Sequence, residues 1–128
     1  MNQKQKGNRR EREFANICKE QGFEDAHRTQ QFCGNTSEDA SDVVGLPFIH
    51  CEVKGTQVTN INQFMKQAKR DSKKKNREEY PVVFYKRNNQ PWLAVMEVDD
   101  WFKFYKKFLE GKENGTSNWL YNWRIKSD

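Results

Sequence analysis

Three charged residues, Asp42, Glu52 and Lys54, lie in an otherwise apolar stretch, DVVGLPFIHCEVKG (42–55), where charged side chains are unexpected. Carboxylates at the ends of two adjacent strands can meet in space even when they are well separated in sequence. Together with a backbone carbonyl they would suit Mg²⁺, which prefers hard oxygen ligands. A water bound to such an ion becomes a nucleophile near neutral pH, and a neighbouring lysine can orient that water or neutralise a phosphate. The three residues therefore predict a unit that cleaves phosphodiesters.

The pattern within FIHCEVKG (48–55) supports this prediction. Alternate residues of a strand share a face, so Glu52 and Lys54 would point the same way. Structural interpretations remain open: Asp42 as a turn residue, and Glu52 with Lys54 as an exposed pair at a strand edge. His50 shares the face of Glu52, but a strand histidine is more often packed or exposed than a ligand. We leave it outside the predicted site.

The elements that would position these residues follow from hydrophobic spacing and turn signals. The expected elements are helices at 8–21, 60–76 and 100–111 and strands within 23–32, 42–46, 48–55, 80–87 and 91–98. Gly22 and Gly111 would end the first and last helices, and Asp99 would cap the last. The order α-β-β-β-α-β-β-α predicts an α/β fold with a mixed sheet flanked by helices.

Length and composition set the class of protein. A chain of 128 residues predicts a single domain, here with residues 1–8 unstructured and 112–128 forming an aromatic C-terminal extension. The net charge of +5 suggests a polyanionic partner. Three widely spaced cysteines and two histidines do not support a structural zinc site or a disulfide framework. With no signal peptide and no membrane-length apolar run, we expect a cytoplasmic protein with reduced thiols.

The order of these features resembles the PD…(D/E)xK nuclease superfamily, and within it the archaeal and phage-type Holliday-junction resolvases. KGNRRERE is similar to their opening KG…ER, SDVVG to their PDI element, and IHCEVKG to their (I/E)xK strand. KQAKRD resembles the glutamine-bearing helix that follows. The likeness covers about residues 6–100. Ser41 departs from the pattern, because a proline usually stands before the aspartate.

The resemblance implies a restriction-endonuclease-like core and a set of site residues. Asp42, Glu52, the Val53 carbonyl and Glu11 would be the metal ligands, Lys54 the catalytic lysine, Gln67 a further catalytic residue and Gln63 a weaker candidate. Mg²⁺ would be the cofactor, with Mn²⁺ as a substitute. Glu11 could instead cap a helix with Asn8, because the two have the spacing of a capping box. Gln67 could instead be a solvated helix residue.

Positive charge gathers in two clusters, one next to Glu11 and one on or after the second helix. Lysines and arginines that neutralise phosphates release counterions and give sequence-independent affinity for DNA. A solvated helix face is the alternative explanation. The residues predicted to bind DNA are Lys6, Arg9, Arg10, Arg12, Arg28, Lys66, Lys69, Arg70, Lys73 and Lys74.

The leading hypothesis is a Mg²⁺-dependent, structure-selective endonuclease that resolves Holliday junctions in recombination or repair, within a bacterial or phage-infected host cell. Two strands of a junction must be cut, so we expect a homodimer, for which the aromatic last third of the chain could supply the interface. That segment could equally fold back over its own sheet. A nuclease of the same fold that acts on flaps, nicks or DNA ends is the first alternative. A non-catalytic nucleic-acid-binding module and a basic scaffold protein are alternatives of another class.

Overall fold

The computed structural model describes residues 3–29, 41–56, 60–74 and 78–114. The chain divides into two compact units, residues 1–96 and 97–128, and the predicted single nuclease domain spans both. Among the described residues, no helix combines the length and the apolar character that crossing a membrane requires.

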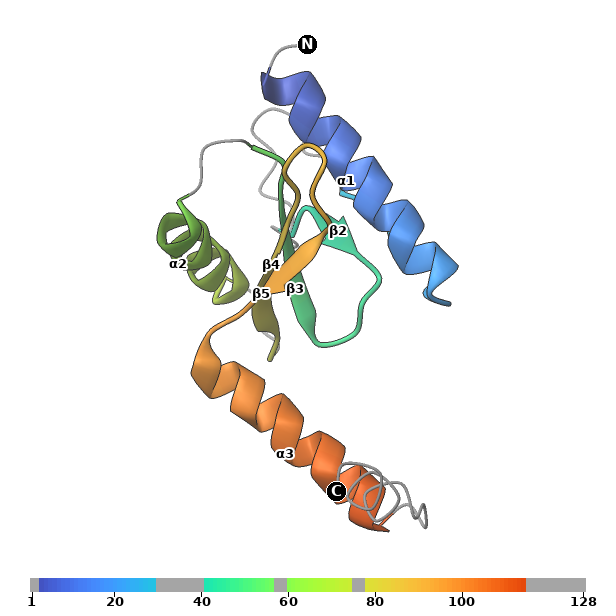
Figure 1. Cartoon of the computed structure of the whole chain (residues 1–128), viewed down its shortest axis with the longest axis vertical. Coiled ribbons are helices and arrows are strands. Elements are labelled where there is room, and N and C mark those ends of the chain that lie inside the picture. The colour runs from blue at the N-terminus through green and yellow to red at the C-terminus, as the bar shows by residue number, and fades with distance from the viewer. Residues whose placement is uncertain (1–2, 30–40, 57–59, 75–77, 115–128) are drawn as a thin grey trace. The chain divides into compact units, whose positions relative to one another are not determined.

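The first unit is a five-stranded mixed sheet with one helix on each face (Figure 1). Its helices are α1 (Gln3–Glu20) and α2 (Ile61–Ser72), and its strands are β1 (His27–Arg28), β2 (Val43–Val44), β3 (Ile49–Lys54), β4 (Tyr80–Tyr85) and β5 (Leu93–Val95). The strands lie in the order β1-β2-β3-β4-β5. Only β3 and β4 pair in parallel, with α2 as their crossover, while the other pairs are antiparallel. This is the restriction-endonuclease-like α/β fold, and the predicted element order is confirmed.

Strand β3 is the centre of the sheet and the element on which the site depends. It pairs with β4 along its whole length, from Ile49 opposite Tyr80 to Lys54 opposite Tyr85. On its other side it meets β2, where Val43 pairs with Cys51. Because the strand is held on both sides, the alternation of its side chains between the two faces is fixed.

Each face of the sheet has its own small apolar core. Under α1, Phe14 stacks on Phe84 with ring centroids 4.1 Å apart, and Cys51 and Val53 of β3 are buried with it. Under α2 the buried cluster is Met65, Ala68, Val83 and Tyr85. The second face of β3 does not add aliphatic residues to the α2 core but presents His50, Glu52 and Lys54.

Gly45 closes the turn after β2 against the segment that leads into β1. Its φ is +108°, a backbone conformation that glycine adopts readily and residues with a Cβ rarely do. A Cβ at this position would lie 2.6 Å from the Ala26 Cα, so side chain and backbone could not both be accommodated. The position thus explains why the chain has glycine three residues after Asp42.

Element boundaries differ from the sequence-based expectation in several places, and α2, expected at 60–76, already ends at Ser72. Helix α1 begins at Gln3, inside the segment expected to be unstructured, because its Gln, Lys and Arg residues are good helix formers. The strand expected within 23–32 is only two residues long among the described residues. In the second unit, α3 (Val98–Asn114) starts before Asp99 and continues through Gly111, since one glycine costs a helix only about 1 kcal/mol.

Helix α3 carries a high density of aromatic residues. Trp101 stacks on Tyr105 with ring centroids 5.1 Å apart and meets Phe102 edge-on at 5.0 Å. The exposed large hydrophobic residues of this helix are Val98, Trp101, Phe102, Phe104, Tyr105 and Phe108. The strand or edge cover expected in the C-terminal extension falls on residues 115–128, which lie outside the described part of the chain.

Candidate active site

Asp42 is attached to β3 by two hydrogen bonds. Its backbone N–H donates to the Cys51 carbonyl at 2.8 Å, and its Oδ2 accepts from the Val53 N–H at 2.9 Å. The side chain therefore takes the place of a strand residue just before β2 begins. Since the N–H and C=O of one strand residue point to the same side, the Val53 carbonyl faces the same side of β3 as Asp42. Carboxylate and carbonyl oxygens thus converge at the start of β2.

Glu52 and Lys54 share the face of β3 that α2 covers, as the alternation predicted. Glu52 is only 1% exposed. Lys54 Nζ donates to Gln67 Oε1 of α2 at 3.0 Å and lies 5.3 Å from the centroid of the Phe64 ring. The structure therefore brings Gln67 to the predicted lysine. Gln63, one turn earlier, instead bonds Asn60 at the start of the helix.

Glu11 reaches the same edge of the sheet from α1. It pairs with Arg28, whose Nε lies 3.7 Å from Glu11 Oε1, and Arg28 Nη2 donates to Asn8 Oδ1 at 2.9 Å. Because α1 begins at Gln3, Asn8 lies inside the helix and caps nothing. The capping-box interpretation of Asn8 and Glu11 is therefore wrong.

The carboxyl groups of this edge have strongly raised pKa values. Burial raises the pKa of Glu11 to about 7, with a further contribution from the charge of Asp42. Burial raises the pKa of Asp42 to about 7, and the neighbouring Glu52 adds to it. Burial raises the pKa of Glu52 to about 7 as well, against the opposing charge of Lys54. Desolvation and mutual repulsion both disfavour three anions here.

This donor set fits a hard divalent cation. The groups that converge are oxygen donors, and their negative charges are destabilised by burial and by one another. A bound cation removes that penalty by taking the place of the protons. Mg²⁺ and Mn²⁺ accept carboxylate and carbonyl oxygens.

Two residues of this region were missed in the sequence. His50 is fully buried, and its Nε2 lies 2.9 Å from Glu52 Oε1 while its Nδ1 lies 3.0 Å from Ser41 Oγ. Asp71 of α2 is close enough that His50, Glu52 and Asp71 each present a ligand atom within 4.8 Å of the others. Asp71 stands four residues after Gln67, one helical turn, and that spacing was the signal available for it.

The basic residues predicted to bind DNA lie in different environments. Arg10 is 6% exposed and donates to Glu13 at 2.8 Å and to Asn88 at 2.7 Å, so its guanidinium joins α1 to the turn after β4. Arg28 is engaged by Glu11 and Asn8, and Arg9 pairs with Glu13 at 3.5 Å. The exposed members are Arg9, Arg12, Lys66, Arg70, Lys73 and Lys74, and the half-buried ones are Lys6, Arg28 and Lys69.

A polar groove of about 490 Å³ runs along α2. Asn60, Asn62, Gln63, Lys66, Gln67 and Arg70 line it. Gln67 belongs both to this groove and to the contact with Lys54. The groove therefore joins the candidate active site to exposed positive charge.

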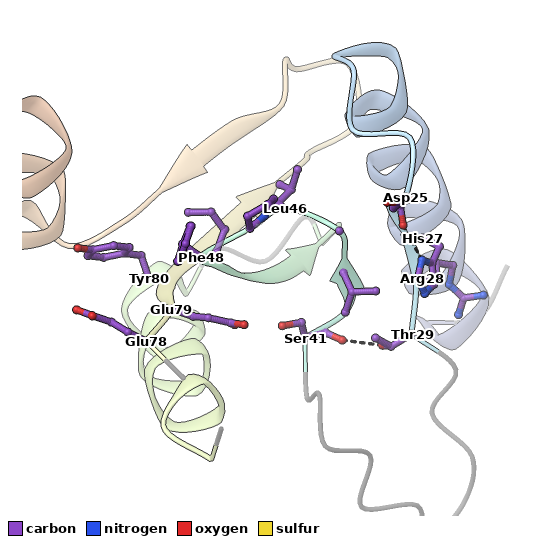
Figure 2. Close-up of a pocket in the computed structure, with 14 residues that line it drawn as sticks. Asp25, His27, Arg28, Thr29, Ser41, Leu46, Phe48, Glu78, Glu79 and Tyr80 are labelled. Atoms are coloured by element: carbon purple, nitrogen blue, oxygen red, sulfur yellow. Dashed lines mark hydrogen bonds between the residues drawn. The ribbon is translucent and has the colours of Figure 1, made fainter. Parts of the chain in front are cut away.

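A larger open pocket of about 1150 Å³ lies at the other end of β3 (Figure 2). Arg28 and Thr29 line one side of it and Glu78 and Glu79 the other, and Thr29 Oγ1 donates to the Ser41 carbonyl at 2.6 Å. Neither Glu52 nor Lys54 lines this pocket. Its acidic residues would repel the phosphate backbone of a nucleic acid. We therefore do not assign DNA binding to this pocket, although it is larger than the α2 groove.

Comparison with known proteins gives one match. A family model described as "Phage putative PDDEXK endonuclease" matches residues 2–127 of the chain. No curated protein and no solved structure matches it.

Proposed function

This chain belongs to the phage PDDEXK endonuclease family, and we propose that it cuts branched DNA, with the four-way Holliday junction as its substrate. The observation that carries the nuclease chemistry is the meeting of Asp42, Glu52 and Lys54 at one edge of β3. Asp42 is fixed to the Val53 amide at 2.9 Å, and Lys54 is fixed to Gln67 at 3.0 Å. These hydrogen bonds orient the Asp42 carboxylate and the Lys54 ammonium group before the substrate binds.

We assign the metal ligands to Asp42, Glu52, the Val53 carbonyl and Glu11, with Mg²⁺ as the ion and Mn²⁺ as a substitute. When bound, the ion would supply an acidified water and positive charge at the scissile phosphate. Asp42 and Glu52 would hold it, and Arg28 holds the Glu11 side chain at the edge of the site. Lys54 donates to a non-bridging phosphate oxygen or to the attacking water, and Gln67 holds its ammonium group in place.

The proposed path of the DNA backbone is the α2 groove and the exposed side of α1. Lys66 and Arg70 line the groove, and Lys73 is exposed at the C-terminal end of α2. Arg12 is exposed one residue after Glu11. Contacts of this type read the position of phosphates and not the base sequence, as recognition of a junction by shape requires. The buried Arg10 has no place on this surface.

A junction has to be cut on two strands, whereas this chain has one such carboxylate site among its described residues. We therefore propose a two-fold homodimer, because most small homo-oligomers are C₂ dimers. The exposed aromatic residues of α3 are the surface we assign to its interface. Light scattering at micromolar concentration checks this part, and a strict monomer would contradict it.

A panel of DNA substrates tests the proposal. Labelled four-way junction, flap, nicked duplex and linear duplex are incubated with the protein and Mg²⁺, each in the presence of unlabelled linear competitor. We expect symmetric cuts in the junction at protein concentrations that leave the duplex intact. Preferred cleavage of flaps, nicks or ends would support a nuclease but contradict the Holliday junction as its substrate. Binding of DNA without cleavage of any substrate would favour the non-catalytic module.

A further inference from the structure

The Glu52 carboxylate has a buried partner that the proposed chemistry does not use. His50 stands two residues earlier on the same face of β3, and its Nε2 lies 2.9 Å from Glu52 Oε1. Both side chains are essentially inaccessible, with His50 0% and Glu52 1% exposed. Burying an imidazole and a carboxylate is costly unless each is hydrogen-bonded, and here they bond one another.

Ser41 extends this contact into a chain of three side chains. Its Oγ lies 3.0 Å from His50 Nδ1, and Ser41 is itself 1% exposed. With a neutral imidazole and an ionised Glu52, one arrangement satisfies both contacts: the Ser41 hydroxyl donates to Nδ1, and the Nε2–H donates to Glu52 Oε1. Ser41 thereby selects the ring tautomer that presents a proton to the carboxylate.

Ser41 and Asp42 are adjacent in the sequence, so one short segment contacts both β3 and the His50 imidazole. Asp42 accepts from the backbone of β3, while Ser41 reaches the imidazole that holds Glu52. The two carboxylates of the proposed metal site are therefore tied to the same stretch of β3 through neighbouring residues. Moving either carboxylate would break one of these hydrogen bonds.

We propose that His50, oriented by Ser41, is the positioning residue that holds the Glu52 carboxylate in its ligating orientation. This inference rests on the proposed function, since it gives Glu52 a role toward a metal ion. Hydrogen-bond partners of metal ligands fix the geometry of the ligand, and their loss commonly lowers metal affinity by about 10–100-fold. A variant that removes the imidazole donor should therefore lose metal affinity by the same factor.

The grouping of His50, Glu52 and Asp71 offers a competing arrangement in which His50 is itself a ligand. The contacts of the imidazole favour the positioning role. Both of its ring nitrogens are within hydrogen-bond distance of a side chain, and a cation at Nε2 would have to displace the contact with Glu52. The experiment below separates the two arrangements by a spectroscopic signature.

The test measures Mn²⁺ binding to the full chain without DNA, from the free-ion signal in electron paramagnetic resonance. His50→Leu removes the donor, whereas His50→Gln keeps an amide N–H close to the position of Nε2. We expect His50→Leu to weaken Mn²⁺ binding by about 10–100-fold and His50→Gln to restore most of the affinity. Ser41→Ala, a small truncation, should weaken binding in the same direction by less.

Cys51→Ala is the matched control, because Cys51 is a buried β3 residue of the opposite face. It should change thermal stability without changing Mn²⁺ affinity. If His50→Leu does not fold, as judged by circular dichroism, Ser41→Ala and His50→Gln carry the comparison. A merely structural role would lower stability in all variants and leave the affinity of the folded protein unchanged, which would overturn the proposal.

Three outcomes would overturn the proposal or the function on which it rests, and they are distinguishable. A nitrogen coupling in the spin-echo spectrum of bound Mn²⁺ that disappears in His50→Gln would make His50 a ligand. A wild-type chain that binds no Mn²⁺ and cleaves no DNA would remove the proposed function itself. Wild-type binding and cleavage with unaltered affinity in His50→Leu would remove only the positioning role.

Discussion

At the scale of single residues, the site depends on contacts that hold charged groups before any ligand binds. Lys54 illustrates this, because its ammonium group is placed between Gln67 Oε1 at 3.0 Å and the Phe64 ring. Without the glutamine the flexible lysine side chain would sample several rotamers. Its charge would then be correctly placed for only part of the time.

Gln67→Ala should therefore slow cleavage by roughly tenfold, the effect of losing one hydrogen bond to a charged group. The effect should appear in the single-turnover rate at saturating Mg²⁺, with DNA affinity almost unchanged. Gln63→Ala is the matched control on the same helix, since both glutamines line the α2 groove but Gln63 contacts Asn60 and not Lys54. Equal rates for both variants would show that the Gln67 contact does not matter for catalysis.

The raised pKa values predict how stability depends on pH when no metal is bound. The pKa of Asp42 is about 7 in the folded chain against an ordinary value of 3.8, so the folded state binds more protons between these values. Stability is then fully present below about pH 4 and is lost as pH rises through 7. Thermal unfolding in EDTA should show a falling midpoint from pH 5 to pH 8, which Asp42→Asn flattens and Mg²⁺ opposes. A midpoint that rises over this range in EDTA would contradict the carboxyl cluster.

At the scale of elements, the sequence predicted the features that local patterns determine. Alternation in 48–55 placed Glu52 and Lys54 on one face, and the order of helices and strands was correct. What it could not predict depends on contacts between distant segments. Arg10 looked like a surface charge because its partner Asn88 lies 78 residues away. His50 looked incidental because its hydrogen-bond partner Ser41 lies nine residues earlier, in the segment before β2.

The turn after β2 offers a direct test of how tightly these elements fit. Gly45→Ala should destabilise the fold by about 3 kcal/mol, because the left-handed φ and the close Ala26 backbone both oppose a Cβ. Gly7→Ala is the matched control, since nothing lies within 4 Å of a Cβ there. In the helix interior it should stabilise the fold by about 0.5–1 kcal/mol. Chemical denaturation measures both, and equal effects would contradict the described packing of β1 against β2.

At the scale of the whole molecule, the net charge of +5 says less than the placement of its free cations. Arg10 and Arg28 are engaged within the protein, whereas Lys66 and Arg70 are exposed along the α2 groove. The groove is continuous with Lys54 through Gln67. Affinity for DNA should therefore depend on α2 far more than on the average charge of the surface.

Replacing Lys66 and Arg70 together by glutamine should weaken binding to all DNA sequences alike. The slope of log affinity against log salt should fall by about two units, one for each lost phosphate contact. Lys19→Gln with Arg87→Gln removes the same charge from exposed positions of the first unit outside the groove and should leave the slope nearly unchanged. Equal slopes for the two double variants would show that the groove does not carry the DNA.

The metal site built on Asp42 is tested most directly by cleavage of a labelled four-way junction by the wild-type chain and by Asp42→Asn, each with Mg²⁺ and with EDTA. Wild type should cut with Mg²⁺ and not with EDTA. Asp42→Asn should lose about 100-fold or more of the rate while binding the junction almost as well, because it removes only the charge that holds the ion. Cleavage that persists in EDTA, or an Asp42→Asn rate equal to that of the wild type, would contradict a metal site built on Asp42.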